Sequence, residues 1–370
     1  MLLLIPGPVT TRPETRAALA HDFAPWDNDF RPLLAGLCQR LLRIAGGTPD
    51  THTVLPLQGC GHFITEAAVR TFIPAGGKLL IPDTGSYSDR MVRLAREAGR
   101  IPVSLPISPG APTPPEAVAA ALKADPDISH VGVVYSETGS GVVHDPATIG
   151  AVARAAERRL IVDAVSAFGA LPLDVSTQPE IDAAVFTSNK CLEGMPGMAF
   201  AVARIDRLEA CAGNAGSWSF DLASIHAYTL RAGPGSSRFT PPAQVINALN
   251  RALDFHEAEG QPARLARYTE NMRVLYDGVQ AFGLTPCLAR EHQGPIIVNV
   301  HAPDDPAWDL QRFVDALKRR GVLISNFYNT PAPSFRVGCI GAIMPDDMRR
   351  AVGAMAEALN ELGINRRRAA

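Results

Sequence analysis

Residues 181–197 read Ile-Asp-Ala-Ala-Val-Phe-Thr-Ser-Asn-Lys-Cys-Leu-Glu-Gly-Met-Pro-Gly, and this stretch decides the fold. The first six residues are apolar or small except for Asp182, which is typical of a buried strand. Three short polar residues follow, and then Lys190 precedes a turn that contains glycine and proline. The stretch therefore predicts a lysine at the carboxyl end of a buried strand. The alternative is an ordinary surface lysine just beyond a strand.

A second strand end lies 27 positions earlier, in Arg-Leu-Ile-Val-Asp-Ala-Val-Ser-Ala-Phe-Gly at 159–169. Asp163 closes the apolar run, and ligands of open α/β sheets collect at the carboxyl ends of strands. A carboxylate there can keep a pyridine nitrogen protonated, and a desolvated lysine keeps a free amine that can attack an aldehyde. Together Asp163 and Lys190 predict pyridoxal phosphate held as a Schiff base. The alternative for Asp163 is an N-cap for the turn that follows.

Four further segments supply candidate contacts. The glycines of Gln58-Gly59-Cys60-Gly61-His62, between a strand and a helix, would let the backbone approach a phosphate. Tyr87 could stack on a planar ring or simply pack on the sheet. Thr138 could bond the cofactor's phenolic oxygen or belong to a polar turn. Arg336 lies in a short apolar strand and needs an anion, either a substrate carboxylate or a structural salt-bridge partner.

The composition is that of a globular enzyme. The chain has 370 residues, of which 46% are hydrophobic and 19% charged, with a net charge of −2. This charge gives no reason to expect nucleic acid or an anionic membrane as a partner. The six cysteines form no CxxC pair, which favours reduced thiols and a cytoplasmic protein. No apolar run reaches the length of a membrane span, and no metal site is expected.

Strand-like and helix-like segments alternate, which predicts βα units and a mostly parallel sheet. Strands are expected at 54–57, 78–81, 101–105, 130–136, 160–163, 181–186, 199–204, 296–300, 322–325 and 335–337. Helices are expected at 12–20, 31–45, from about 62 through 71, 87–98, 115–124, 146–158, 242–259, 264–282, 307–320 and 345–362. The wider spacing after about residue 250 predicts a small C-terminal α/β domain. The predicted division is 1–20 as an N-terminal segment reaching the small domain and the active-site entrance, 21–255 as the large domain, and 256–370 as the small domain.

Taken together, the chain resembles the class V aminotransferases of fold type I, and within that class the branch that acts on 2-aminoethylphosphonate and pyruvate. The resemblance spans nearly the whole chain. It rests on Leu-Ile-Pro-Gly-Pro-Val-Thr-Thr at 4–11, Trp-Asp-Asn-Asp-Phe at 26–30, Leu-Gln-Gly-Cys-Gly-His-Phe at 57–63 with Glu66, Glu-Thr-Gly at 137–139, 163–169, Ser-Asn-Lys-Cys at 188–191 with Gly194, Pro196 and Gly197, Arg-Phe-Thr-Pro-Pro at 238–242, and Phe-Arg-Val-Gly-Cys-Ile-Gly at 335–341.

The resemblance implies a role for each matching position. Lys190 would carry the cofactor and move the proton of the reaction, and Asp163 would pair with the pyridine nitrogen. The other cofactor contacts implied are Gly59, Cys60, Gly61, His62, Tyr87, Thr138, Val165, Asn189 and, from the partner subunit of a homodimer, Thr240. Arg336 would bind the keto-acid carboxylate, and the segment with Pro8 and Thr10 would hold the phosphonate.

The resemblance leaves the amino donor open between two groups. The favoured donor is 2-aminoethylphosphonate with pyruvate as acceptor, as in phosphonate catabolism. Tyr135-Ser136, Gly139-Ser140-Gly141 and His62 depart from the phosphonate pattern, and His62 is typical of the alanine–glyoxylate branch. Alanine or serine, with glyoxylate or pyruvate, is therefore the alternative. Two other activities are less well supported. A cysteine desulfurase would need a histidine where Asn189 stands, and a non-catalytic regulator would normally lack the lysine.

Overall fold

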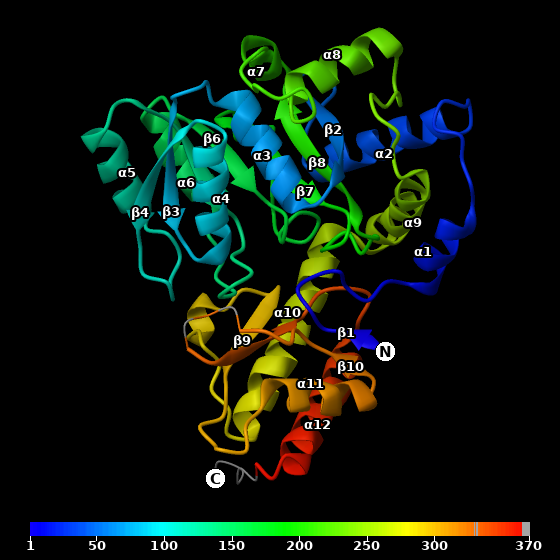
Figure 1. The fold of residues 1–370 in the computed structure, drawn as a ribbon, viewed down its shortest axis with the longest axis vertical. Coiled ribbons are helices and arrows are strands. Elements are labelled where there is room, and N and C mark those ends of the chain that lie inside the picture. The colour runs from blue at the N-terminus through cyan, green and yellow to red at the C-terminus, as the bar shows by residue number, and fades with distance from the viewer. Residues whose placement is uncertain (329, 331, 365–370) are drawn as a thin grey trace.

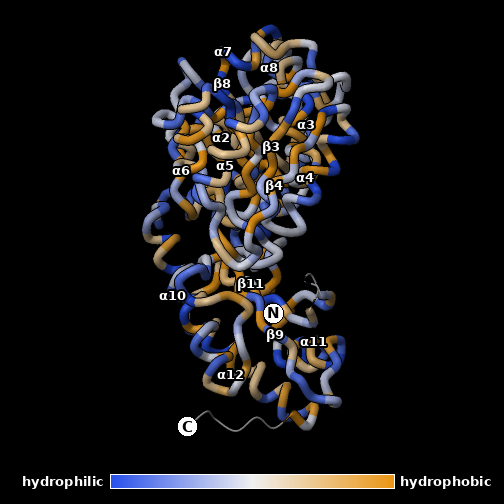
Figure 2. The backbone as a smooth tube through the Cα atoms, turned by 90° about the vertical axis from the view of Figure 1, so that its left-hand side faces the viewer, coloured by the Kyte–Doolittle hydropathy of each residue, from blue (hydrophilic) through white to orange (hydrophobic). Residues whose placement is uncertain are grey.

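The computed structural model describes residues 1–328, 330 and 332–364. It has a large part built on one sheet and a smaller part below it, and both the N-terminus and helix α10 lie at their junction (Figure 1). Figure 2 shows the same two parts stacked along the long axis of the molecule. No helix in the described part of the chain combines the length and apolar character needed to cross a membrane.

The large part is organised by a seven-stranded sheet in the order β2-β8-β7-β6-β5-β3-β4. Its strands are β2 (His52–Gly59), β3 (Lys78–Asp83), β4 (Ile101–Pro106), β5 (Ile128–Val134), β6 (Arg159–Asp163), β7 (Ile181–Thr187) and β8 (Gly197–Arg204). Only β8 runs against its neighbours, pairing antiparallel with both β2 and β7. The predicted mostly parallel sheet is therefore confirmed, and Lys190 lies in the turn that joins β7 to β8.

Alternate residues of the central strands enter two different cores, as the two-residue period of a strand requires. In β6, Leu160 and Val162 face one core and Ile161 faces the other. Both faces are covered by helices, which explains why the strands are apolar throughout. One face packs on α2 (Phe30–Ile44), α5 (Pro115–Ala124), α6 (Pro146–Ala155) and α9 (Ala243–Glu259); the other packs on α3 (Gly61–Phe72), α4 (Ser86–Glu97), α7 (Ile205–Ala210) and α8 (Leu222–Ala232).

The small part has a separate hydrophobic core. Its antiparallel pair of strands is β9 (Ile297–His301) and β11 (Ser334–Gly338), and β1 (Leu2–Leu3) pairs in parallel with β10 (Val322–Leu323). Its helices are α10 (Gln261–Ala281), α11 (Leu310–Arg319) and α12 (Pro345–Glu361). The first residues of the chain thus belong to the same core as the last 100 or so. The proposed boundary at residue 255 falls within α9.

Short elements account for most differences from the predicted helices and strands. Helices α7 and α8, strand β1 and the 3-10 turn η2 (Arg290–His292) were not predicted, and the predicted first helix is α1 (Pro13–Ala17) followed by the 3-10 turn η1 (Ala18–Ala20). Helix α6 ends at Ala155 rather than 158, because Glu157 takes the left-handed conformation (φ 56°) that terminates helices. Of the strand predicted at 322–325, only the first two residues form a strand, β10.

Candidate active site

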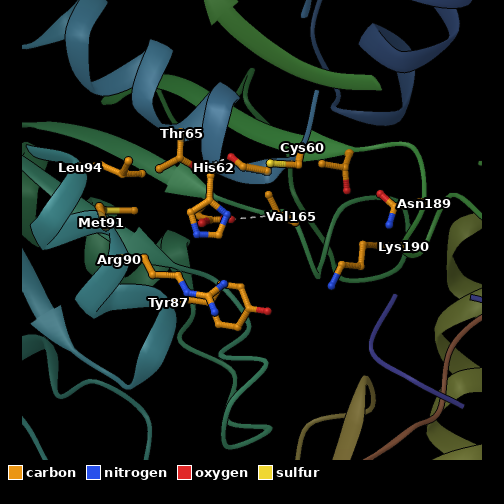
Figure 3. Close-up of a pocket in the computed structure, with 13 residues that line it drawn as sticks. Cys60, His62, Thr65, Tyr87, Arg90, Met91, Leu94, Val165, Asn189 and Lys190 are labelled. Carbon is orange, nitrogen blue, oxygen red and sulfur yellow. Dashed lines mark hydrogen bonds between the residues drawn. The ribbon is translucent and has the colours of Figure 1, made fainter. Parts of the chain in front are cut away.

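A cavity of ≈ 200 Å³ opens at the carboxyl ends of the parallel strands (Figure 3). It gathers eight of the predicted site residues from segments far apart in the sequence. Its lining consists of Cys60, Gly61, His62, Thr65, Tyr87, Arg90, Met91, Leu94, Asp163, Val165, Thr187, Asn189 and Lys190. In the view of Figure 3, Lys190 and Asn189 line one side of the cavity, and Tyr87, Arg90 and His62 line the other.

Lys190 is held by a tightly bonded turn and is only 8% exposed. Its carbonyl oxygen accepts from Glu193 N–H (2.9 Å), and the Ser188 carbonyl accepts from Gly194 N–H (2.8 Å). Burial lowers the pKa of the Lys190 amine to about 8. An appreciable fraction of the amine is therefore uncharged near neutral pH, as a nucleophile or proton acceptor requires. The alternative of an ordinary surface lysine does not fit this burial.

The N-terminal segment covers the Lys190 side chain. A methyl group added at Gly7 would lie 2.6 Å from Lys190 Cδ, closer than real atoms approach. Gly7 also has a φ of +139°, which side-chain-bearing residues rarely adopt. The segment 1–20 was predicted to reach the active-site entrance, and Gly7 is the residue that approaches Lys190 closely.

Asp163 closes β6 at the floor of the cavity and is buried. Its Oδ1 accepts a hydrogen bond from Val165 N–H (3.0 Å). Burial raises the pKa of Asp163 to about 6, against the opposing influence of Val165 N–H and Lys190. A buried carboxylate with so few donors suits a cationic partner such as a protonated ring nitrogen. The bond from Val165 N–H also caps the turn that follows β6, so the N-cap role considered for Asp163 is compatible with this structure.

The N-terminus of α3 supplies an anion site at the other end of the cavity. Cys60 is its N-cap and uses no side-chain cap; Phe63 N–H bonds to the Cys60 carbonyl oxygen, which leaves the N–H groups of Gly61 and His62 to face a ligand. A Cβ on Gly61 would lie 3.0 Å from Val165, which shows how closely the helix approaches the loop after β6. Thr187 Oγ1 is buried on the same lining and has no partner among the described residues. These donors fit a phosphorylated ring cofactor.

Tyr87, Arg90 and His62 line the side of the cavity opposite Lys190. The Arg90 guanidinium carbon lies 4.6 Å from the centre of the Tyr87 ring. His62 points into the same region (Figure 3), and burial, reinforced by Arg90, lowers the pKa of its imidazole, which favours the neutral ring. Arg90 was not predicted. The available signal was its position three residues after Tyr87, which places both side chains on one face of a helix.

Arg336 provides a buried cation that, in the described residues, has no carboxylate within ion-pair distance, although buried Glu137 and the Tyr87 hydroxyl lie near it. Its Nη1 donates to the Thr138 carbonyl oxygen (3.1 Å), and its guanidinium carbon lies 5.0 Å from the centre of the Phe327 ring. Its Nε is buried and unpartnered, and no ion pair joins Arg336 to a carboxylate in the described residues. Burial lowers the pKa of this guanidinium. The structural salt bridge considered above is therefore not supported, and the group is free to receive an anionic substrate.

Glu137, which was not predicted as a site residue, holds the surrounding loops. It accepts from Gly139 N–H (2.9 Å) and Tyr87 N–H (3.2 Å), joining the segments after β3 and β5. Burial raises the pKa of Glu137 to about 7. The next residue, Thr138, shares a hydrogen bond of 2.6 Å with the Ser166 hydroxyl. Thr138 thus lies beside the loop after β6, although it is not on the cavity lining.

Besides Thr138 and Arg336, four predicted residues are absent from the lining of this cavity. Pro8 is exposed, and Thr10 Oγ1 is already engaged by Leu3 N–H (2.8 Å), so neither offers a free donor to the cavity. Gly59 and the exposed Thr240 line a second, more apolar cavity of ≈ 450 Å³. Trp218 borders that surface and is 69% exposed.

Comparison with known proteins places this geometry in context. Residues 43–326 match the aminotransferase class-V family. The chain is 47% identical to a 2-aminoethylphosphonate–pyruvate transaminase of Burkholderia ambifaria (strain MC40-6), with 98% of this chain and 96% of that protein covered. It is 45% identical to 2-aminoethylphosphonate–pyruvate transaminase 1 of Burkholderia lata, with 100% and 99% covered. It superposes on pyridoxamine–pyruvate aminotransferase from Mesorhizobium loti with a TM-score of 0.89 at 27% identity, with 100% and 94% covered. The full-length superposition confirms the predicted fold.

Proposed function

The chain belongs to the class-V aminotransferases, a family that depends on pyridoxal phosphate, and we propose that it moves the amino group of 2-aminoethylphosphonate to pyruvate. The products would be phosphonoacetaldehyde and alanine. The observation that carries this proposal is the meeting of a buried, readily deprotonated Lys190 with two arginines, Arg90 and Arg336, that have no acidic partner in the described residues. These groups offer one reactive amine and two places for anionic ends of substrates.

Pyridoxal phosphate is the cofactor we propose for the cavity. When bound, it supplies the electron sink that stabilises a carbanion next to the amino group. Asp163 would face the pyridine nitrogen and keep it protonated, and Tyr87 would cover the ring. The N–H groups of Gly61 and His62, with Asn189, would hold the phosphate at the N-terminus of α3.

Lys190 would move the protons. Its Nζ is the only amine on the cavity lining as described, and its lowered pKa lets it accept a proton from the amino-bearing carbon of the donor near neutral pH. The covering N-terminal segment at Gly7 restricts where that amine can travel. Burial of Lys190 and Asp163 also limits the access of water to the reacting atoms.

The two arginines would divide the anionic groups of the substrates. Arg336, buried and fixed by the Thr138 carbonyl, suits the planar carboxylate of pyruvate. A phosphonate carries more negative charge than a carboxylate and needs further donors. Arg90 is exposed, lies over the Tyr87 ring and has no ion-pair partner in the described residues, so it can turn toward the larger group. It replaces Pro8 and Thr10 as the proposed phosphonate contact.

We propose a homodimer in which Thr240 reaches the cofactor phosphate of the partner subunit. The segment that carries Thr240 is exposed and lies against an apolar cavity of ≈ 450 Å³. The neighbouring Trp218 and Phe239 rings pack edge to face at 5.1 Å yet remain exposed. Exposed aromatic residues around an apolar hollow are typical of an interface between subunits.

The second candidate is transfer from alanine or serine to glyoxylate or pyruvate. It is favoured by His62, whose neutral ring narrows the cavity beside Tyr87 and would suit a smaller donor. We propose that the larger donor is nevertheless accepted, because Arg90 lies on the same side and supplies the charge that a phosphonate needs.

A donor comparison on the purified, cofactor-loaded enzyme tests this choice. The measured quantity is kcat/KM for 2-aminoethylphosphonate with pyruvate and for alanine or serine with glyoxylate. We expect the phosphonate reaction to be preferred. A tenfold or greater preference for alanine with glyoxylate would leave the family assignment intact and refute the proposed donor.

A further inference from the structure

Four charged side chains form a buried cluster outside the cavity, and the proposed reaction uses none of them. The cluster consists of Glu193, Glu259, Arg264 and Arg267, so its two acids balance its two bases. Arg264 is fully buried, and only Glu259 has appreciable exposure. Burying charges costs desolvation free energy, so buried ion pairs are a poor source of stability. The segments that this cluster connects are therefore a better guide to its role.

Arg267 is the centre of this cluster because one guanidinium contacts three separate segments. Its Nε donates to Glu259 Oε1 (2.6 Å), at the end of α9. Its Nη2 donates to Glu193 Oε1 (2.8 Å), in the turn that contains Lys190. Its Nη1 donates to the carbonyl oxygens of Gly341 (2.7 Å) and Ile343 (2.9 Å), in the small part of the molecule.

The Lys190 end of this connection is tightly fixed. Glu193 lies three residues after Lys190 and donates its N–H to the Lys190 carbonyl oxygen. Its Oε1 also accepts from the Tyr268 hydroxyl (2.7 Å). Arg264 Nη1 donates to the Cys191 carbonyl oxygen (2.8 Å). Helix α10 therefore holds this turn through hydrogen bonds to Cys191 and Glu193, which lie one and three positions after Lys190.

The other end of the connection follows the strand that carries Arg336. Gly341 lies five residues beyond Arg336, and the intervening Cys339 carbonyl accepts from Asn271 Nδ2 (3.0 Å), again on α10. Lys190 and Arg336 lie 146 positions apart in the sequence and on different parts of the fold. Arg267 is the side chain that bonds to the segments of both.

We propose that Arg267, acting with Glu193, is a positioning residue that fixes Lys190 relative to Arg336. The rigid fork of an arginine can hold several acceptors at once in fixed directions, which a lysine cannot. The inference rests on the proposed function for the roles of Lys190 and Arg336. The new element is that hydrogen bonds from α10, outside the cavity, fix the position of Lys190 relative to that of Arg336.

The test compares Arg267→Lys with Arg273→Lys in the full-length enzyme. Arg273 lies on the same helix but pairs with Glu270 at the exposed surface, so it controls for charge-preserving change on α10. The first readout is the rate at which cofactor-stripped protein regains its visible absorbance when pyridoxal phosphate is added, which reports the placement of Lys190 without turnover. The second is KM for pyruvate, which reports Arg336.

We expect Arg267→Lys to slow reconstitution and to raise KM for pyruvate, each by about tenfold or more, since displacements of about 1 Å at an active site can cost about a hundredfold. Arg273→Lys should stay within about twofold of the wild type, as exposed pairs contribute little. Glu193→Gln, which keeps the shape of the side chain, should change both readouts in the same direction and provides the test if Arg267→Lys does not fold.

If the cluster has a structural role alone, Arg267→Lys and Glu193→Gln should lower the melting temperature and leave the reconstitution rate and KM for pyruvate unchanged. That result would overturn the proposal. The reconstitution rate involves no amino donor, and pyruvate KM can be measured with any donor that the enzyme accepts. A failure of the proposed donor is therefore distinguishable from a failure of this inference.

Discussion

Burial sets the protonation of the two central residues. Lys190 and Asp163 both lie inside the protein at the ends of neighbouring strands, and desolvation disfavours the charged form of each. The pKa of the lysine falls to about 8 and that of the aspartic acid rises to about 6. Such opposed shifts in one cavity are typical of catalytic sites. The burial and charge of these side chains predict how single substitutions change activity.

Lys190→Ala should abolish transamination and the visible absorbance of the bound cofactor, because it removes the only amine on the described cavity lining. We expect a loss of about 10³-fold or more, in the range for a removed acid–base group. Steady-state kinetics and absorbance spectra on the purified variant measure this, with circular dichroism as the control for folding. Turnover close to that of the wild type would refute the assignment.

Arg336→Ala and Arg90→Ala should affect different substrates. Loss of Arg336 should raise KM for pyruvate by about 30-fold or more, since truncating one side of a buried charged pair costs about 2–5 kcal/mol. Arg90→Ala should raise KM chiefly for 2-aminoethylphosphonate. The measurement is the pair of KM values for each variant. Equal effects of both substitutions on both substrates would contradict the proposed division.

The elements bring parts of the chain to the site that are remote in sequence. Strand β1 pairs with β10 in the small part, and the chain then turns across the cavity so that Gly7 covers Lys190. Helices α9 and α10 join at Glu259 and Gln261, where the ionic cluster connects both parts of the molecule. Each of these two contacts between segments predicts the effect of a substitution at the residue that makes it.

Gly7→Ala should lower kcat while leaving the protein folded, because the added methyl group would displace Lys190 or lift the N-terminal segment. Gly76→Ala is the matched control. It also has a positive φ, but its value of +74° costs a side chain less than the +139° at Gly7, and nothing lies within 4 Å of its added Cβ, so it controls for a methyl group that makes no contact. Comparison of kcat and melting temperature separates contact from strain. Equal losses of kcat in both variants would argue against a close approach at Gly7.

Glu259→Gln should make the enzyme less sensitive to acid. Burial alone would raise the pKa of Glu259, but its hydrogen bonds with Arg267 and Arg264 lower that pKa from 4.5 to about 2. A lowered folded-state pKa contributes stability above about pH 4.5 that disappears as the pH falls toward 2, by about 3 kcal/mol in the free energy of unfolding. Urea unfolding of wild type and variant between pH 7 and 3 measures it. Parallel pH curves would contradict the prediction.

The described part of the molecule has a candidate site in the large part and, apart from it, an apolar hollow with exposed aromatic rings beside it. The large part lines the cavity and carries Lys190, and Arg336 of the small part lies near enough to influence the charge of Lys190. Thr240 and Gly59 line the separate apolar hollow, with exposed aromatic rings beside it. A second copy covering that hollow would bring Thr240 to a partner's phosphate.

Mixed dimers test that arrangement directly. Thr240→Asp homodimers should bind cofactor about tenfold or more weakly, since a carboxylate placed beside a phosphate is repelled. Co-expressed Lys190→Ala and Thr240→Asp subunits should regain about half of the wild-type activity, because one site in each mixed dimer then has both native residues. Absence of recovery in purified mixed dimers would show that Thr240 does not act across the interface, and an active monomer in sedimentation would refute the dimer itself.

The sequence by itself determined the class of fold, the family and the Lys190–Asp163 pair. Apolar runs at 160–162 and 181–186 mark strands buried on both faces, and the polar residue that ends each run must emerge at the same edge of a parallel sheet. This information is local, because it depends on the order of residues within a few positions. The family assignment is confirmed by the full-length relatives, while the roles of the individual site residues remain predictions.

Only the tertiary structure decided which other residues meet at the site. Gly7 and Lys190 are separated by 183 positions, and nothing near either residue signals their contact. Thr10 was a reasonable phosphonate contact by sequence, yet pairing of the N-terminal segment commits its hydroxyl to Leu3. By sequence, Arg90 and Arg267 resemble ordinary helix arginines. In the folded chain Arg90 lies over Tyr87, and Arg267 donates to four residues from three segments. Such contacts arise when separate segments pack together, and packing is a property of the folded chain as a whole.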